Sequence, residues 1–331
     1  MNTNNHIHYD KTNILNTAKQ VVVDEINGIE HMLSQLGEAF YQALELIINC
    51  KSKIILTGIG KSGHIAKKIA ATFASTGTPS FFVHPAEALH GDLGMIEHAD
   101  VVIAISYSGE ADELSNIIPS LKRKEIKIIG ITGNTTTSTL AKLSDIIISV
   151  KINKEACPLN LAPTTSTTAT LVLGDIMAVC LMQMRGFQPI DFAMSHPGGS
   201  LGRKLLTKNS DIMRTGDGMP IVHKHSTLKE VVIEISKKTL GFAVVVESGS
   251  PIGIITDGDL RRHLQMDGDI NNTQAQELMS SNPKTVYMDD LAISSASLLD
   301  KFKITGFIVV DDKSELIGVF NLHDIVTAKL L

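Results

Sequence analysis

Residues 57–66, TGIGKSGHIA, contain the glycine spacing of two different phosphate-binding loops. One is the G-x-G-x-x-G loop of dinucleotide sites, and the other is the Gly-Lys-Ser end of a Walker A loop. A Walker A loop also needs a glycine five positions earlier, where this chain has Ile55. A dinucleotide site needs an acidic residue about 20 positions further on, where the chain has Thr78, Pro79 and Ser80. The loop is therefore weak evidence for a nucleoside triphosphate or for NAD.

Small hydroxyl side chains gather where predicted strands end. Ser62 follows the first strand, and Ser106 and Ser108 follow the third, in ISYSGE. The run TTSTT at 164–168 leads into a long predicted helix. Ligands of open parallel sheets bind at the carboxyl edge, and helix N-termini suit a phosphate dianion. Helix capping is the alternative for the TTSTT run, but one cap uses fewer hydroxyls, so we favour phosphate contact.

Five ionisable side chains in loops of the same predicted edge could move protons: Lys61, His90, Glu113, Glu155 and His196. Histidine carries protons near neutral pH, and lysine could neutralise phosphate or enediolate charge. Each residue also has a structural interpretation. Glu113 in a first helical turn favours the helix dipole in any protein, Lys61 and Glu155 could be solvated surface charges, and a histidine next to Pro or Gly is often only a backbone partner.

The elements that must hold these residues alternate between short apolar strands and helices. We expect one or two helices over 9–49, strands at KIILTG, SFFVH, VVIAIS, IKIIGIT and DIIISV, and helices near 64–75, 110–124 and 166–185. Strands separated by helices of about 10–15 residues indicate βαβ units. Helices on both faces explain why the strands are apolar throughout. The predicted fold is α/β, with a parallel five-stranded, Rossmann-like sheet flanked by helices.

Beyond Leu206 the sequence repeats itself with a period of about 65 residues. GFAVVVESGSPIGIITDGDLRRHL is echoed by GFIVVDDKSELIGVFNLHDIVTAKL, so that Gly253 pairs with Gly318 and Asp259 with Asp324. Each copy reads strand, helix, strand, turn, strand, helix. The repeat resembles a tandem pair of CBS domains (α+β), which implies one pseudo-symmetric unit that binds an adenine nucleotide or another small regulator. A purely structural or oligomerising module is the alternative.

The remaining motifs bring a second resemblance. GIGKSGHIAKKIAATFASTGTPSFFVHPAEALHGDLGM, AISYSGE, KEACPLNLAPTTSTTATLVLGD and DFAMSHPGGSLGRKLL resemble the sugar isomerase (SIS) family, in the long form of the bacterial D-arabinose 5-phosphate isomerases with two CBS domains. The sequence departs from that family at Tyr107, where Asn is more frequent, and at Ala111, where Ser or Thr is usual. The implied domains are 1–208 (SIS, with N-terminal helices), 209–270 (first CBS) and 271–331 (second CBS).

The resemblance implies an aldose–ketose isomerase that interconverts D-ribulose 5-phosphate and D-arabinose 5-phosphate through a cis-enediol, the first step of Kdo and lipopolysaccharide synthesis. This chemistry needs a base near carbon 2, an acid for the oxygens and a stabiliser of the enediolate, and it requires no cofactor. The implied catalytic residues are Lys61, Glu113, Glu155 and His196, with Glu155 as the base and His196 as the ring-opening acid. The expected substrate-binding residues are Ser62, Gly77, Thr78, His84, His90, Ser106, Ser108, Thr165, Ser166 and Thr167.

The resemblance also implies partners. His84 is a candidate zinc ligand with a modulating role, although isolated histidines are weak evidence for zinc. We expect a homotetramer whose active site draws on neighbouring subunits, and a nucleotide or CMP-Kdo as effector of the CBS pair. A non-catalytic sugar-phosphate sensor and a SIS isomerase acting on another sugar phosphate are the alternatives. The short, acidic first 50 residues argue against a DNA-binding regulator with an N-terminal helix-turn-helix.

Composition limits the function classes. The chain has 331 residues, a net charge of -5 and a hydrophobic fraction of 43%. Without a basic patch it carries no electrostatic footprint for nucleic acid or anionic lipid. The longest apolar run, near 169–184, contains Asp175 and is short of a membrane span of roughly 20 clean residues. The polar start MNTNNHIHYD is no secretory signal, and three cysteines without C-x-x-C spacing are typical of reduced thiols. We therefore expect a cytoplasmic protein.

Overall fold

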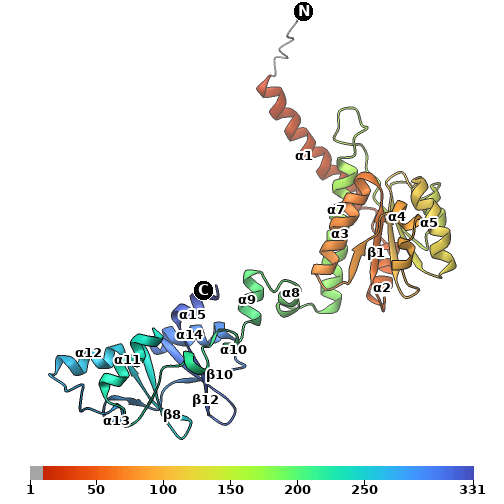
Figure 1. Ribbon diagram of the computed structural model, residues 1–331. Coiled ribbons are helices and arrows are strands. Elements are labelled where there is room, and N and C mark those ends of the chain that lie inside the picture. Colours follow the sequence, from red (N-terminus) through yellow and green to blue (C-terminus); the bar gives the residue numbers. More distant parts are fainter. Residues whose placement is uncertain (1–9) are drawn as a thin grey trace, which may run out of the picture. The chain divides into compact units, whose positions relative to one another are not determined.

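The computed structural model describes residues 10–331, so Tyr9, where the first predicted helix starts, and the polar residues before it lie outside the described part. The chain divides into two compact units, one ending at Ser195 and the other running from His196 to Leu331. Figure 1 shows both units. Cys50, Cys157 and Cys180 are free thiols, as the sequence predicted.

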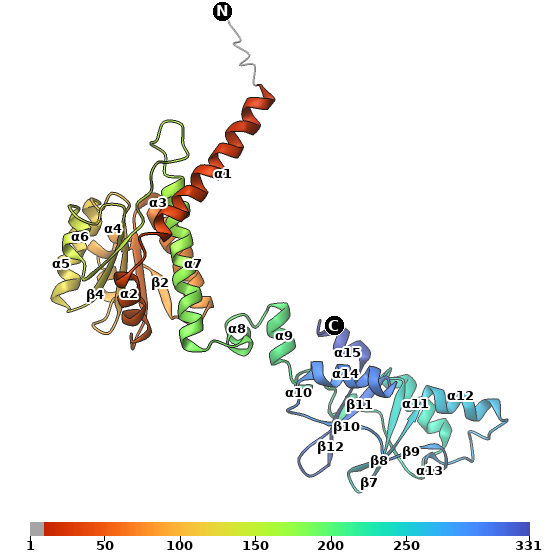
Figure 2. The same cartoon turned by 180° about the vertical axis from the view of Figure 1, so that it is seen from behind.

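The first unit is a parallel sheet between two layers of helices, which confirms the predicted α/β fold. The sheet order is β2-β1-β3-β4-β5, and Figures 1 and 2 show α3 and α7 on one side and α5 on the other. The elements are α1 (Lys11–Leu33), α2 (Glu38–Ile48), β1 (Ile54–Gly58), α3 (Gly60–Ser75), β2 (Ser80–Phe82), α4 (Pro85–Leu89), a 3-10 turn (Asp92–Met95), β3 (Val101–Ile105), α5 (Asp112–Arg123), β4 (Lys127–Thr132), α6 (Thr139–Leu143), β5 (Ile146–Ser149), α7 (Thr165–Arg185) and α8 (Pro189–Ser195).

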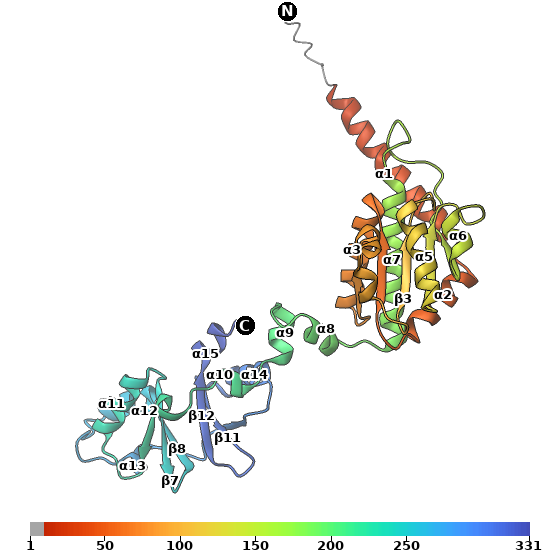
Figure 3. The same cartoon turned by 45° about the vertical axis from the view of Figure 1, so that its right-hand side comes forward.

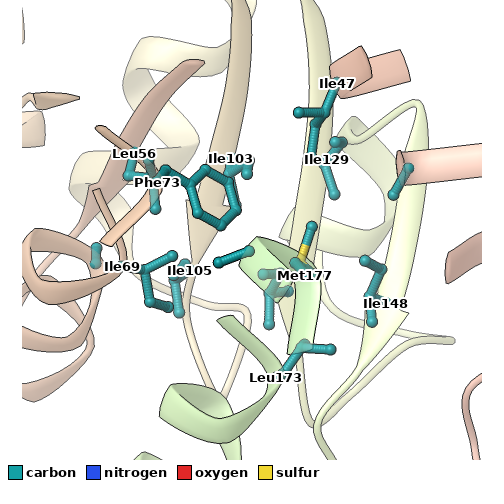
Figure 4. Close-up of a cluster of buried hydrophobic side chains, with 14 of the residues drawn as sticks. Ile47, Leu56, Ile69, Phe73, Ile103, Ile105, Ile129, Ile148, Leu173 and Met177 are labelled. Atoms are coloured by element: carbon teal, nitrogen blue, oxygen red, sulfur yellow. The ribbon is translucent and has the colours of Figure 1, made fainter. Parts of the chain in front are cut away.

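Two hydrophobic cores form because successive strand residues point to opposite faces of the sheet. Along β3, Val101, Ile103 and Ile105 face α3 and α7, whereas Val102 and Ala104 face α5. Figure 4 shows the first of these cores, in which side chains from four strands meet Phe73 of α3 and Met177 of α7. The two cores together explain the continuous apolar strands that the sequence shows.

The glycine motif is explained by packing between β1 and α3. A Cβ atom on Gly63 would lie 2.6 Å from the carbonyl oxygen of Gly58, so only glycine allows the helix to approach the strand this closely. Gly60 has a φ of +57°, a left-handed conformation that glycine adopts without strain. Helix α3 begins at Gly60, four residues before the predicted start at His64. Lys61 and Ser62 therefore lie in the first helical turn rather than in an open loop.

Helix α7 is the one helix in residues 10–331 that is long and apolar enough to cross a membrane by length and composition. Half of that stretch is buried inside the unit, where α7 packs against α1, α2 and α3. A core helix passes the same test of length and composition, so this helix is weak evidence for a membrane span.

The second unit contains the two sequence repeats. Its elements are α9 (Ser200–Leu206), α10 (Asn209–Ile212), a 3-10 turn (Gly216–Gly218), β6 (Ile221–His223), α11 (Leu228–Lys238), β7 (Phe242–Glu247), β8 (Ser250–Thr256), α12 (Asp257–Gln265), α13 (Ala275–Leu278), β9 (Ser280–Ser281), β10 (Thr285–Tyr287), α14 (Ala292–Phe302), β11 (Gly306–Val310), β12 (Leu316–Asn321) and α15 (Leu322–Thr327). Helix α9, which precedes residue 208, belongs to this unit and packs against α14.

The repeats are alike in register as well as in element order. The sheets run β6-β7-β8-β9 and β10-β11-β12, with a β-bulge after Val245 in the first copy and after Val309 in the second. Figure 3 shows the paired strands of the two copies side by side. They share one buried cluster, in which Phe242 and Val244 meet Ile308 and other residues of the second copy. The predicted pair of related α+β domains is confirmed.

Candidate active site

A cavity of about 510 Å³ lies at the carboxyl edge of the parallel sheet. Its walls come from the first turn of α3, the loop after β3, and the segment that joins β5 to α7. Seven residues predicted for the site line it: Lys61, Ser62, Ser106, Ser108, Glu155, Ser166 and Thr167. They meet because the carboxyl ends of parallel strands share one edge of the sheet.

Two helix N-termini reach this cavity without a side-chain cap. Ile59 precedes α3 and Ala111 precedes α5, and neither side chain accepts a hydrogen bond from the helix. Both residues line the cavity. The first backbone N–H groups of a helix have no partner inside the helix, and they carry a partial positive charge. With the exposed ammonium of Lys61 beside them, they make this wall of the cavity attractive to an anion.

The serines after β3 are held by a tight turn. The hydroxyl oxygen of buried Ser106 accepts a hydrogen bond from the backbone N–H of Gly109 at 3.1 Å, and Ser108 accepts one from Glu110 at 3.3 Å. Gly109 has a φ of +73°, and a Cβ there would lie 2.4 Å from the Ser138 hydroxyl. The glycine of the S-x-S-G sequence thus lets both hydroxyls take fixed positions at the cavity.

The Glu155 carboxylate occupies the N-terminal end of α7. Its Oε2 atom accepts hydrogen bonds from the backbone N–H of Thr164 at 2.8 Å, from the Thr164 hydroxyl at 3.0 Å and from the backbone N–H of Ser166 at 3.2 Å. Burial alone would raise the pKa of Glu155, but hydrogen bonds from Ser166 and Thr164 outweigh it and hold the pKa below its ordinary value. Glu155 is therefore a carboxylate at neutral pH.

Thr164, the N-cap residue of α7, makes no side-chain cap, so helix capping does not explain the TTSTT run. Thr165 is fully buried outside the cavity lining, and its hydroxyl oxygen accepts from the backbone N–H of Ala156 at 3.0 Å. The Thr167 hydroxyl donates to the carbonyl of Thr164 at 2.8 Å. Local hydrogen bonds therefore hold Thr165 and Thr167 in place, and Ser166 and Thr167 line the cavity.

Sequence reasoning missed several lining residues. Tyr107 appeared only as a departure from the family, Lys154 and Asn160 appeared only inside a quoted motif, and Asn153 did not appear at all. Asn160 accepts a hydrogen bond from the backbone N–H of Glu155 at 2.7 Å, and Lys154 pairs with Asp24 of α1 at 2.9 Å. These residues come from an irregular segment with no periodicity, and the positive φ of Asn160 (54°) is invisible in the sequence.

Tyr107 fits its position through packing. Its ring lies against Gly133, where a Cβ would approach Cε2 to 2.6 Å, and its hydroxyl oxygen accepts from the backbone N–H of Ile152 at 3.4 Å. Burial raises the pKa of the Tyr107 phenol, and the nearby charge of Glu155 raises it as well. The phenol therefore keeps its proton at neutral pH.

Gly77 and Thr78 do not line this cavity. They precede β2 at the amino edge of the sheet, where the backbone N–H of Ile54 donates to Pro79 at 2.8 Å. Gly77 has a φ of +88° and packs under the Phe187 ring, and the buried Thr78 hydroxyl has no hydrogen-bond partner within the described chain. Within one chain the structure thus separates these two residues from the other predicted substrate contacts.

His84, His90 and Glu113 also lie outside the cavity lining. His84 and His90 flank α4 after β2, and the Nδ1 atom of His84 accepts from the backbone N–H of Ala86 at 3.3 Å. Glu113 stands in the first turn of α5, two residues after Ala111. Among residues 10–331, no three His, Cys, Asp or Glu side chains gather in a way that could hold a metal ion, and His84 therefore has no set of fellow ligands within that part of the chain.

His196 opens the second compact unit. Its carbonyl oxygen accepts from the backbone N–H of Gly199 at 3.0 Å, and a Cβ on Gly202 would lie 2.1 Å from that oxygen. The glycines of the SHPGGSLG sequence thus allow α9 to start directly against His196.

Comparison with known proteins agrees with this architecture. The SIS domain model matches residues 46–180, and the CBS domain model matches residues 210–266 and 275–330. The two matches define a SIS-domain protein that carries a pair of CBS domains.

The relatives identify the family. The chain is 49% identical to arabinose 5-phosphate isomerase KdsD of Salmonella typhi over 94% of both chains, and 45% identical to that of Francisella tularensis over 96% of this chain and 98% of the relative. It belongs to the arabinose 5-phosphate isomerase family. A solved structure of an Escherichia coli CFT073 protein in complex with arabinose 5-phosphate is 41% identical, covers 57% of this chain and all of its own, and has a TM-score of 0.55.

Proposed function

We infer that this chain is an aldose–ketose isomerase that interconverts D-ribulose 5-phosphate and D-arabinose 5-phosphate. The observation that carries this conclusion is the cavity at the sheet edge, which joins an anion-attracting wall to the ionised carboxylate of Glu155. A pentose phosphate has this pair of features: a dianion at one end and exchangeable protons at the other. Relatives that match almost the whole chain carry the name of this activity.

We propose that the phosphate binds at the N-terminus of α3. The free backbone N–H groups of its first turn, the ammonium of Lys61 and the hydroxyls of Ser62, Ser106 and Ser108 all face the same cavity. The N-terminus of α7 is the less suitable place, because the Glu155 carboxylate already accepts its hydrogen bonds and would repel a second anion.

Glu155 is the proposed base for the proton at carbon 2. Its lowered pKa keeps it ionised and ready to accept a proton, and the hydrogen bonds that lower the pKa also fix its position. A carboxylate with a low pKa is a weaker base, so the cis-enediol must be stabilised in turn. Lys61, which lines the same cavity, is the proposed stabiliser of that negative charge.

Several residues predicted for the active site lie outside the cavity, which favours an active site built from more than one chain. We propose a homotetramer in which Glu113, His90, Gly77 and Thr78 contribute across subunit contacts, and in which His196 protonates the ring oxygen. Helix α1 supports assembly because Leu15, Val22, Ile26 and Leu33, spaced along its length, are all about half exposed or more. Such an apolar row on a long helix is typical of a surface that another chain covers.

The same proposal extends to the pathway and the regulator. We place the reaction at the start of Kdo and lipopolysaccharide synthesis, in the cytoplasm, with no required cofactor and with zinc at His84 as a modulator at most. In the CBS pair, a cavity of about 1100 Å³ is lined by Thr256, Asp259, Arg261, Arg262 and Lys284 among others. Its mixture of carboxylate and cationic groups suits a nucleotide or CMP-Kdo as effector.

A steady-state assay of the purified full chain in both directions tests the activity. Interconversion of ribulose 5-phosphate and arabinose 5-phosphate, with exchange of the carbon 2 proton into solvent, is expected. Binding of pentose phosphate without turnover would instead make the protein a sensor, and turnover of only hexose or heptose phosphates would assign it another sugar phosphate.

A further inference from the structure

The two CBS copies present equivalent sites whose occupants differ. Ser280, from the start of the second copy, pairs with Ile254 of β8 in the first copy, and Arg214, from the start of the first copy, pairs with Val319 of β12 in the second. Neighbouring contacts confirm that these positions correspond. A Cβ on Gly253 would meet Met279 at 2.4 Å, and a Cβ on Gly318 would meet Met213 at 2.5 Å. The repeat therefore has serine at one site and arginine at the other.

The Arg214 side chain occupies the second site. Its Nε and Nη2 atoms donate to Oδ1 of Asp324 at 3.1 and 2.9 Å, and its Nη1 donates to the carbonyl of Lys238 at 3.0 Å. Asp324 is the counterpart of Asp259, which lines the open cavity of the first site. The Arg214 guanidinium thus links Asp324 of the second copy to the end of α11 in the first copy. It fills the place that corresponds to the open cavity beside Asp259.

The ends of the two equivalent helices, α11 and α14, also differ. Lys238, the last residue of α11, is only 14% exposed, lies 3.9 Å from Glu234 and donates to the carbonyl of Asp217. Lys303, the left-handed residue after α14 that corresponds to Thr239 after α11, lines the open cavity, is 80% exposed and pairs with Asp300 of its own helix at 2.7 Å. Asn321 adds a further contact across the second site, from its Nδ2 atom to the carbonyl of Leu240 at 3.4 Å.

The charges agree with this difference. Arg214 neutralises Asp324 inside the second site, where the two side chains are 29% and 15% exposed. At the first site Asp259 pairs with Arg262 of its own helix, which is 65% exposed. Arg261, Arg262, Lys284 and Lys303 leave the first cavity with an excess of positive charge over Asp257 and Asp259.

We propose that Arg214 acts as a built-in occupant that closes the Asp324 site, so that each chain binds one anionic ligand, at the Asp259 site. The proposal rests on the proposed effector cavity but does not depend on the isomerase reaction. The cationic side chains of that cavity would hold the anionic group of the ligand.

A reciprocal exchange of the two residues tests the proposal. Isothermal titration of the full chain with AMP, and separately with CMP, gives the number of sites per chain. We expect one site in the wild type and two in R214S. In S280R we expect binding at least about 10-fold weaker, because an arginine then closes the remaining cavity (a tenfold change is about 1.4 kcal/mol). Ser280 is exposed, so S280R is expected to fold even if R214S does not.

Different failures have different meanings. Two equivalent sites in the wild type, or S280R that binds as tightly as the wild type, would overturn the assignment of Arg214 as an occupant. A wild type that binds neither nucleotide would overturn the nucleotide site itself. Isomerase activity without nucleotide, measured on the same samples, is expected to be unchanged in both variants, so that loss of the reaction is recognised separately.

Discussion

The Oε2 atom of Glu155 lies 2.8 Å from the backbone nitrogen of Thr164, so that one carboxylate caps α7 and faces the cavity. The contact ties the proposed base to a long core helix whose position is set by α1, α2 and α3. Stability and catalysis are therefore expected to share this residue, and they can be separated by measuring both.

Replacing Glu155 by glutamine is expected to raise the barrier of the isomerisation by at least about 2 kcal/mol, a roughly 30-fold loss of kcat. Glutamine keeps the shape of the side chain and can still accept one hydrogen bond from Thr164, but it cannot take the proton. Steady-state kinetics checks the prediction, with the exposed Glu97→Gln as control. A kcat within a few-fold of the wild type would show that Glu155 only caps the helix.

The lowered pKa of Glu155 predicts a pH-dependent stability. Its ordinary pKa is 4.5. Because the folded pKa is lower, the ionised carboxylate stabilises the fold fully above 4.5, and this contribution is lost as the pH falls through the folded pKa. The difference in unfolding free energy between wild type and Glu155→Gln should therefore shrink as the pH falls below 4.5. Urea unfolding over this range measures it; a constant difference would contradict the predicted pKa.

Lys61→Ala is expected to raise the KM for the sugar phosphate by about 10- to 100-fold, the worth of a charge-assisted hydrogen bond of roughly 1.5–3 kcal/mol. Any accompanying fall in kcat would measure its part in stabilising the enediolate. Lys51→Ala, at an exposed lysine just before β1, is the matched control. An unchanged KM in Lys61→Ala would move the phosphate away from the N-terminus of α3.

Gly28→Ala tests the contact between α1 and α7. A Cβ on Gly28 would lie 2.1 Å from the Cγ2 atom of Thr165, at the start of α7. Overpacking of this kind costs about 1–3 kcal/mol, and urea unfolding should show that loss. Gly37→Ala is the control, because nothing lies within 4 Å of the added methyl group. Equal stability of the two variants would mean that α1 moves away from α7 without cost.

Assembly through α1 is tested by the double variant Val22→Glu, Ile26→Glu. Two buried charges at a subunit contact would cost several kcal/mol, so light scattering should find a smaller species than in the wild type. Thr17→Glu, on the opposite side of α1 from Ile26, should leave the mass unchanged. If the wild type is already a monomer and is active, the proposed tetramer is wrong.

The fold was accessible from the sequence because its strands are short, apolar and separated by helices. The start of α3 was misplaced because Gly60 is a poor helix former by propensity. In the folded chain, the close contact between Gly58 and Gly63 allows the helix to begin there. That contact depends on the register between strand and helix, which no local pattern reveals.

The site was accessible only in part. The sequence could predict that Ser62, Ser106 and Ser108 lie close together, because the carboxyl ends of parallel strands lie at one edge of the sheet. Glu155 was also expected at that edge, but its hydrogen bonds to the N-terminus of α7 were not, since they depend on the course of an irregular segment between residues 150 and 164. Gly77 and Thr78 came from family resemblance alone, and the structure puts them at the other edge of the sheet.

If Arg214 fills one of the two equivalent ligand sites of the CBS pair, this has a consequence for regulation. A polypeptide with a single working receptor for its signal must respond along a simple saturation curve, with half of the effect at one characteristic concentration. Any steeper, switch-like response would then have to come from communication between copies of the chain in the assembly.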